Sequence, residues 1–143
     1  MSFFSDARRA ALLVLALVLA VGLAACSSGE SSESAAASSG GSTGGTAEVT
    51  DGVVEITADD LAFNATTIVA PAGEAFTIRL VNNDSAPHNI SVYVEEGGDP
   101  VVQGDTINGG ETVEVEVPAL EAGEYFFVCD LHTNMNGTVV VEG

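Results

Sequence analysis

The sequence contains no lysine and no tryptophan, and it has only two histidines, two cysteines and two methionines in 143 residues. Its basic side chains are three arginines against 21 Asp and Glu, so the formal net charge is −18 at pH 7. A surface with this charge repels polyanions. The composition therefore excludes nucleic acid as a partner and disfavours direct binding to anionic lipid headgroups.

The acidity is concentrated in the larger, C-terminal part of the chain. From Glu48 onward there are 18 acidic residues and one basic residue, Arg79, whereas Arg8 and Arg9 lie near the N-terminus. An acidic surface attracts a basic partner and speeds the encounter at low salt. Solubility or a saline habitat explains the same composition, so both interpretations stay open.

The N-terminal segment has the composition of an export signal. The arginine pair precedes a continuous apolar run, residues 10–21, which is shorter than the roughly 20 residues that a membrane-spanning helix needs. The run leads to Leu23-Ala-Ala-Cys26, which resembles a lipobox, the motif of bacterial lipoproteins. Residues 1–26 are therefore expected to be a signal peptide. Lipidation of Cys26 would hold the exported protein at the outer face of the cytoplasmic membrane, in the periplasm or at the cell surface; an uncleaved membrane anchor is the alternative.

Residues 27–47 are expected to form a flexible linker. They comprise eight Ser, five Gly, four Ala, two Thr and two Glu, without apolar periodicity. Such a chain spans about 25 Å and would act as a tether. Residues 48–143 remain as one domain with a single core.

The domain is predicted to be all-β because its apolar residues recur with a period of two. The clearest alternation is T-V-E-V-E-V at residues 112–117, with Val inward and Glu toward water. Gly, Pro and Asn separate the runs, so we expect a β-sandwich of about seven or eight strands. A short helix near Leu61 is the one departure that the sequence allows. The other alternating runs are residues 54–57, 76–80 and 90–94.

Soft metal-binding side chains fall at two places in this domain. Cys129, His132 and Met135 lie within seven residues between two expected strands, and His88 follows Pro87 at the start of another. A thiolate, two imidazoles and a thioether are the ligand set of a blue-copper electron-transfer site. A single Met is more often core filler and a single His more often structural. Their coincidence at mutually compatible places favours a metal site.

Cys129 is expected to lie at the buried end of a central strand. It shares one strand face with Tyr125 and Phe127, and the alternate positions are also apolar. A buried thiolate is costly without a cation. A Cys26–Cys129 disulfide would tie a lipid-anchor position to a strand end across a flexible linker, so it is disfavoured.

The spacing Cys129-x-x-His132-x-x-Met135, followed by Asn-Gly and a Val-rich strand, resembles the copper loop of the cupredoxins. The short gap before Met is most similar to the amicyanin and plastocyanin-like members. Residues 82–90, NNDSAPHNI, resemble the first-ligand motif of the family, and residues 61–74 resemble its N-terminal strands.

This resemblance implies a Greek-key β-sandwich that binds one copper ion, Cu(I) or Cu(II). It implies that His88, Cys129 and His132 are the strong equatorial ligands and that Met135 is the axial one. It further implies that the backbone N–H of Asn89 donates a hydrogen bond to the Cys129 sulfur. The edge of His132 would reach the surface through an apolar rim and form the exit for the electron.

The sequence thus predicts a monomeric one-electron carrier, not an enzyme, that acts between redox proteins outside the cytoplasmic membrane. A copper-delivery or copper-storage protein is the alternative, but such proteins favour Met- and His-rich tracts, which this chain lacks. A copper oxidase or nitrite-reductase-like enzyme needs further histidines for a second copper centre. A metal-free interaction sandwich leaves the ligand set unexplained. The redox partners are not identified, although a basic surface would suit the acidic domain.

Overall fold

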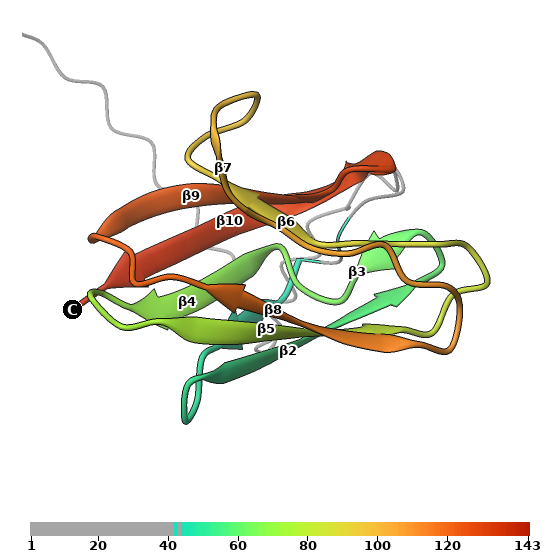
Figure 1. The fold of residues 1–143 in the computed structure, drawn as a ribbon, viewed down its shortest axis with the longest axis horizontal. Helices are drawn as coiled ribbons and strands as arrows, with labels where there is room; N and C mark the ends of the chain where they lie inside the picture. The colour runs from blue at the N-terminus through green and yellow to red at the C-terminus, as the bar shows by residue number, and fades with distance from the viewer. Residues whose placement is uncertain (1–41, 43) are drawn as a thin grey trace, which may run out of the picture. The chain divides into compact units, whose positions relative to one another are not determined.

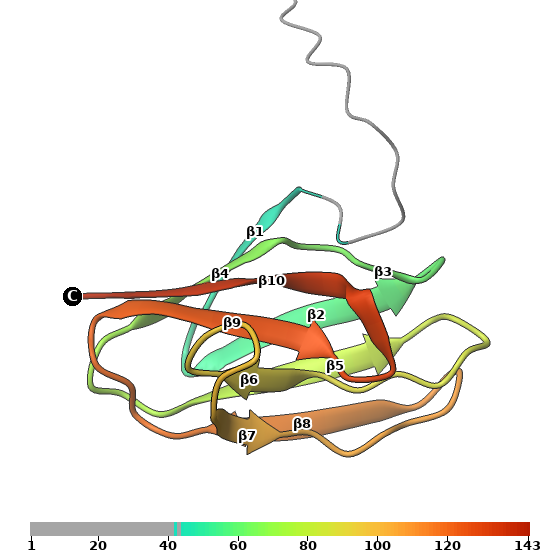
Figure 2. The ribbon, with the colours of Figure 1, turned by 90° about the horizontal axis from the view of Figure 1, so that it is seen from above.

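The computed structural model describes Ser42 and residues 44–143, which form two sheets packed face to face (Figures 1 and 2). The predicted signal peptide with Cys26, and the linker as far as residue 41, lie outside the described residues. No helix long and apolar enough to cross a membrane occurs in the described part of the chain.

The two sheets have six and four strands, in the orders β1-β4-β10-β9-β6-β7 and β3-β2-β5-β8. Strands that follow one another in the sequence often lie in different sheets, so the chain crosses repeatedly between the layers. The predicted all-β sandwich is confirmed. The larger sheet contains β1 (Thr46–Glu48), β4 (Thr67–Pro71), β10 (His132–Glu142), β9 (Gly123–Cys129), β6 (Ser91–Tyr93) and β7 (Pro100–Gln103). The smaller sheet contains β3 (Ala62–Phe63), β2 (Val53–Asp59), β5 (Phe76–Asn82) and β8 (Thr112–Val117).

The described residues form ten strands, more than the seven or eight expected, because β1 and β3 have only three and two residues and carry no detectable periodicity. The helix allowed near Leu61 is absent. Instead, Asp60 and Leu61 form a two-residue turn between β2 and β3, with φ angles of 50° and 57°. Few residues other than glycine adopt this left-handed conformation, so the sequence gives little sign of the turn.

The folded domain begins before the predicted boundary at residue 48. Thr46 and Ala47, assigned to the linker, belong to β1, which pairs in parallel with β4. The Ser42 hydroxyl also donates to the Asn136 carbonyl over 2.7 Å. Composition misses this boundary because only the small side chain of Ala47 packs against the core, while backbone and hydroxyl hydrogen bonds hold the rest of the segment.

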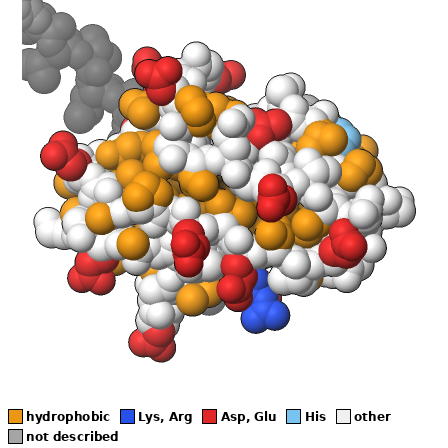
Figure 3. Space-filling model, viewed as in Figure 1, with side chains coloured by type: hydrophobic (Ala, Val, Ile, Leu, Met, Phe, Trp, Pro, Cys, Tyr) orange, Lys and Arg blue, Asp and Glu red, His pale blue; other side chains and the backbone are white. Residues whose placement is uncertain are grey.

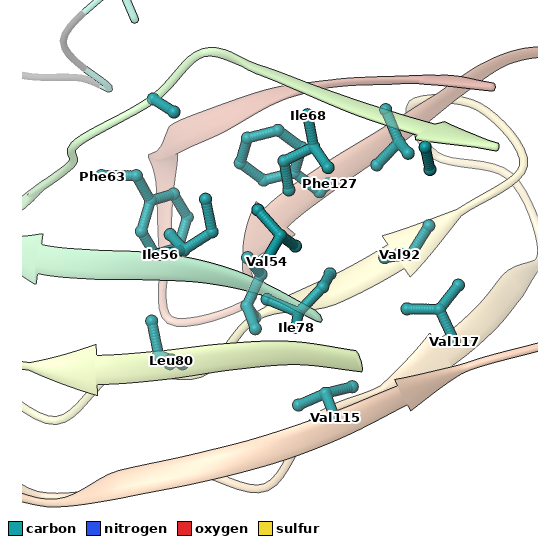
Figure 4. Packing of buried hydrophobic residues seen from close by; sticks show 14 of the residues in the cluster. Val54, Ile56, Phe63, Ile68, Ile78, Leu80, Val92, Val115, Val117 and Phe127 are labelled. Carbon is teal, nitrogen blue, oxygen red and sulfur yellow. The ribbon is translucent and has the colours of Figure 1, made fainter. Parts of the chain in front are cut away.

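Alternating residues of the two sheets meet in one core (Figure 4). On β8, Val115 and Val117 are buried while the intervening Glu side chains face water, as predicted. The rings of Phe63 and Phe127 pack with centroids 5.8 Å apart, joining the two sheets. The expected alternation fails at Val94, which is 51% exposed because β6 ends one residue earlier.

Candidate metal centre

The β9–β10 hairpin places two of the predicted ligands opposite each other. Cys129 ends β9 and pairs with His132 at the start of β10, across a two-residue turn. The strand register then shifts between His132 and Asn136, so that the intervening residues, including Met135, form an irregularity in β10. The last strand therefore begins at His132, and not at Gly137 as expected, because His132 already pairs with Cys129 of β9.

His88 reaches the same place from the segment between β5 and β6, three residues before β6 begins. Its backbone N–H donates to the Ile107 carbonyl over 3.0 Å, and the Ile107 N–H donates back over 2.8 Å. Three residues later, β6 pairs with β9 through Ser91 and Val128. The strand that follows His88 is therefore next to the strand that ends in Cys129, as the site requires. Figures 1 and 2 show the segment after β5 and the β9–β10 turn at the same end of the sandwich.

The side chains of His88, Cys129 and His132 converge on one point. The Cys129 Sγ lies 3.7 Å from Nδ1 of His88 and 3.7 Å from Nδ1 of His132, and the three ligand atoms all lie within 4.8 Å of one another. A sulfur about 2.3 Å and a nitrogen about 2.0 Å from one ion, about 120° apart, are separated by about 3.7 Å. The donor set thus fits a single metal ion, with Met135 close to the other three.

The site is closed on one side and open on the other. His88, Cys129 and Met135 are fully buried, whereas His132 is partly exposed. The apolar side chain of Leu131, beside His132 in the sequence, is 47% exposed. In Figure 3 a small histidine surface is bordered by hydrophobic side chains. Three ligands are thereby shielded from water, and one imidazole edge remains accessible.

Asp84 lies behind the buried imidazole, and sequence reasoning missed it as part of the site. Its Oδ2 is 3.2 Å from Nε2 of His88, the ring nitrogen that points away from Cys129. The pKa of the Asp84 carboxyl is held well below its usual range, first by the N–H donated from Leu61 and then by His88 and nearby backbone N–H groups. The only sequence signal was the i, i+4 spacing to a candidate ligand.

A second acidic residue, Asp130, ties the ligand loop to β6. Its carboxylate accepts hydrogen bonds from Asn89 Nδ2 (2.7 Å), the Ser91 hydroxyl (2.6 Å) and the Tyr93 hydroxyl (2.8 Å). Burial raises the pKa of Asp130, but the bonds from Ser91, Asn89 and Tyr93 outweigh it and lower the pKa overall. The pKa of Tyr93 is raised, chiefly by its hydrogen bond to Asp130.

Asn89 therefore has a role beyond the one predicted for it. Its Oδ1 accepts the backbone N–H of Asp130 over 2.8 Å, so one amide side chain bonds both the backbone and the carboxylate next to Cys129. The proposed hydrogen bond from the Asn89 backbone N–H to the Cys129 sulfur stays a prediction.

Comparisons with known proteins agree with this geometry. The sequence model of the cupredoxin-like domain matches residues 13–141, and the chain belongs to this family. It is 30% identical over 95 residues to amicyanin-alpha of Methylorubrum extorquens, covering 66% of this chain and 76% of that protein. It is 27% identical over 96 residues to amicyanin of Paracoccus denitrificans, covering 67% and 70% of the two chains.

Solved structures of blue-copper proteins also resemble this chain. Auracyanin A of Chloroflexus aurantiacus, described as a "blue" copper protein, superposes with a TM-score of 0.56 and 28% identity, over 62% of this chain and 97% of its own. An auracyanin of Roseiflexus castenholzii, at 19% identity, supports the fold alone, with a TM-score of 0.57 over 63% of this chain and 96% of its own. The protein is thus an electron-transfer cupredoxin and not an enzyme, and its site binds one copper ion.

Proposed function

We propose that the protein is a membrane-tethered type 1 copper protein that carries single electrons between redox proteins outside the cytoplasmic membrane. The observation that carries this proposal is the asymmetry of burial at the site. His88, Cys129 and Met135 are fully buried, while His132 is partly exposed. Such a site shields the metal from water and oxidants and leaves one imidazole edge through which an electron enters or leaves.

The protein's part in this function is to hold the ligands still. Copper, when bound, would supply the one-electron couple between Cu(II) and Cu(I); the two imidazoles and the Cys129 thiolate would hold it strongly and the Met135 thioether weakly. Cys129 and His132 are fixed by their pairing across β9 and β10, and His88 by its two backbone hydrogen bonds to Ile107. A ligand set fixed in this way needs little rearrangement when the charge of the metal changes.

We further propose that the partner docks over His132 and carries a basic surface. Pro87 and Leu131 are exposed apolar residues beside two of the ligands in the sequence. Arg79, the one basic residue of the described part, contacts Glu55 (3.9 Å), so little positive charge opposes the acidic side chains that Figure 3 shows scattered over the surface. An apolar contact region in an acidic field suits fast, transient encounters between proteins.

Electron exchange with a basic redox protein is expected to slow as salt rises. Electrostatic steering speeds association by about 10- to 1,000-fold and is screened by salt, so a tenfold or larger fall in rate is expected between about 10 mM and 0.5 M. Stopped-flow absorbance of the copper-loaded protein would measure the rate. Exchange with an uncharged small-molecule oxidant is the control and should change little. An equally flat profile with the basic protein would favour the solubility interpretation of the acidity.

The tether is proposed from the lipobox-like Leu23-Ala-Ala-Cys26 and the Ser- and Gly-rich segment after it. Cys26→Ser, expressed in a bacterium that processes lipoproteins, should move the protein from the detergent-extractable membrane fraction to the soluble fraction. In this proposal the lipid on Cys26 is the anchor of the exported protein, so nearly complete loss of stable anchoring is expected when that residue is replaced. Cys129→Ser is the matched control and should stay with the membrane. Unchanged fractionation of Cys26→Ser would favour an uncleaved apolar anchor.

A further inference from the structure

We propose that Asp84 is a positioning residue of the copper site. Its carboxylate accepts the Nε2–H of the buried ligand His88 and so holds the ring in place, and its negative charge stabilises Cu(II) relative to Cu(I). This inference rests on the copper site of the proposed function. It assigns a role to a carboxylate that does not touch the metal but contacts one of the metal's ligands.

The first step is the geometry of the His88 ring. Its Nδ1 faces the Cys129 Sγ at 3.7 Å, and its Nε2 lies 3.2 Å from Asp84 Oδ2. A neutral imidazole donates from one nitrogen and offers a lone pair at the other. A carboxylate at Nε2 therefore places the proton there and leaves the Nδ1 lone pair directed to the metal position. Hydrogen bonding of this kind orients a metal-binding histidine and raises its basicity.

The second step is that the carboxylate is itself held in place. The Leu61 N–H donates to Oδ2 over 2.8 Å, and the Ser85 and Ala86 N–H groups donate to Oδ1 over 2.7 and 3.3 Å. Leu61 and its neighbour Asp60 have φ angles of 57° and 50°, a conformation that residues other than glycine keep only when their surroundings require it. The β2–β3 turn thus aims a backbone donor at Asp84.

The third step concerns charge. The His88 side chain is fully buried and that of Asp84 is 14% exposed, so the two interact in a region largely shielded from water. The hydrogen bonds to Asp84 come from backbone N–H groups and an imidazole, and Arg79 lies with Glu55 instead. Because no arginine or lysine of the described region cancels the carboxylate, its charge acts on the metal through the ring. A negative charge favours the higher oxidation state.

The test is Asp84→Asn in the full chain, with the affinities for Cu(II) and Cu(I) and the reduction potential as readouts. Loss of a carboxylate partner of a metal-binding histidine typically weakens metal binding by about 10- to 100-fold, and we expect a loss of that size for Cu(II) and a smaller one for Cu(I). The potential then rises by about 59 mV for each tenfold difference between the two losses. Asp60→Asn is the matched control, because it removes an exposed charge on the neighbouring turn and should leave both affinities and the potential unchanged.

A second variant covers the case in which Asp84→Asn does not fold. Asp84→Ser keeps a hydroxyl that can accept the Ser85 and Ala86 N–H groups but lacks the charge and the reach to His88. Unchanged affinities and potential in whichever variant folds would overturn the inference. Equal losses for Cu(II) and Cu(I) at an unchanged potential would also overturn it, since they would mean a purely structural role. Wild-type protein that took up no copper would overturn the proposed function and this inference together; a blue wild type with unshifted variants would overturn this inference alone.

Discussion

Replacing Cys129 with Ser removes the intense blue colour that we expect of the copper-loaded protein. The colour of a type 1 site arises from charge transfer between a thiolate and Cu(II). Cys129, the one cysteine among the described residues, has its Sγ 3.7 Å from Nδ1 of both histidines. A serine hydroxyl at this position does not become a thiolate-like donor at neutral pH. Essentially all of the visible absorption should be lost, as measured by spectra recorded during titration with Cu(II).

Two controls separate this loss from general damage. Cys26→Ser changes the other cysteine of the chain in the same way and should leave the colour intact. Met135→Leu removes the thioether that we propose as the weak fourth donor, so it should shift the reduction potential while the protein stays blue. A Cys129→Ser protein that remained blue would show that the colour, and the ligand assignment with it, comes from other residues.

The convergence of the four candidate ligands was predictable because their side chains are rare in this chain. The two histidines, and the one cysteine and one methionine of the predicted domain, fall at mutually compatible places in the sequence, so their coincidence was informative. Asp84 and Asp130 gave no comparable signal among 21 acidic residues. Their roles depend on contacts across the fold, such as those from Leu61 to Asp84 and from Asn89 to Asp130, which are 23 and 41 residues apart.

The strands and their buried faces could be predicted from the sequence where a strand is long and buries one face. β5 and β8 alternate over seven and six residues, and their inward positions were correct. The alternation of apolar and polar residues did not predict burial where a hydrogen bond or the end of a strand determines it. Ser91 is fully buried because its hydroxyl binds Asp130, while Val94 extends beyond the end of β6 and faces water. Hydrophobic periodicity carries no information about either event.

Gly137→Ala is expected to destabilise the domain by about 3 kcal/mol, within the upper range for overpacking a close-packed site. Gly137 pairs with Phe127 across β9 and β10, and a Cβ there would lie 2.5 Å from Cζ of that ring and against the Thr66 carbonyl oxygen. Neither neighbour can yield easily. Phe127 is fully buried against Phe63, and the Thr66 carbonyl accepts the Thr138 N–H over 2.9 Å. For a domain of this size the loss corresponds to a fall of roughly 12–24 °C in Tm.

The measurement should use copper-free protein, because a tightly bound metal raises the apparent stability of the folded state and would mask part of the loss. Gly44→Ala is the matched control: nothing lies within 4 Å of its added Cβ, so the stability should change by less than about 1 kcal/mol. Equal Tm values for the two variants would mean that β10 shifts to admit the methyl group. Such a shift would also move Met135, two residues away, and would therefore appear as a changed reduction potential once copper is added. A large stability loss with Gly137→Ala alone would instead show that β10, the Phe127 ring and the Thr66 carbonyl do not move apart to admit the methyl group.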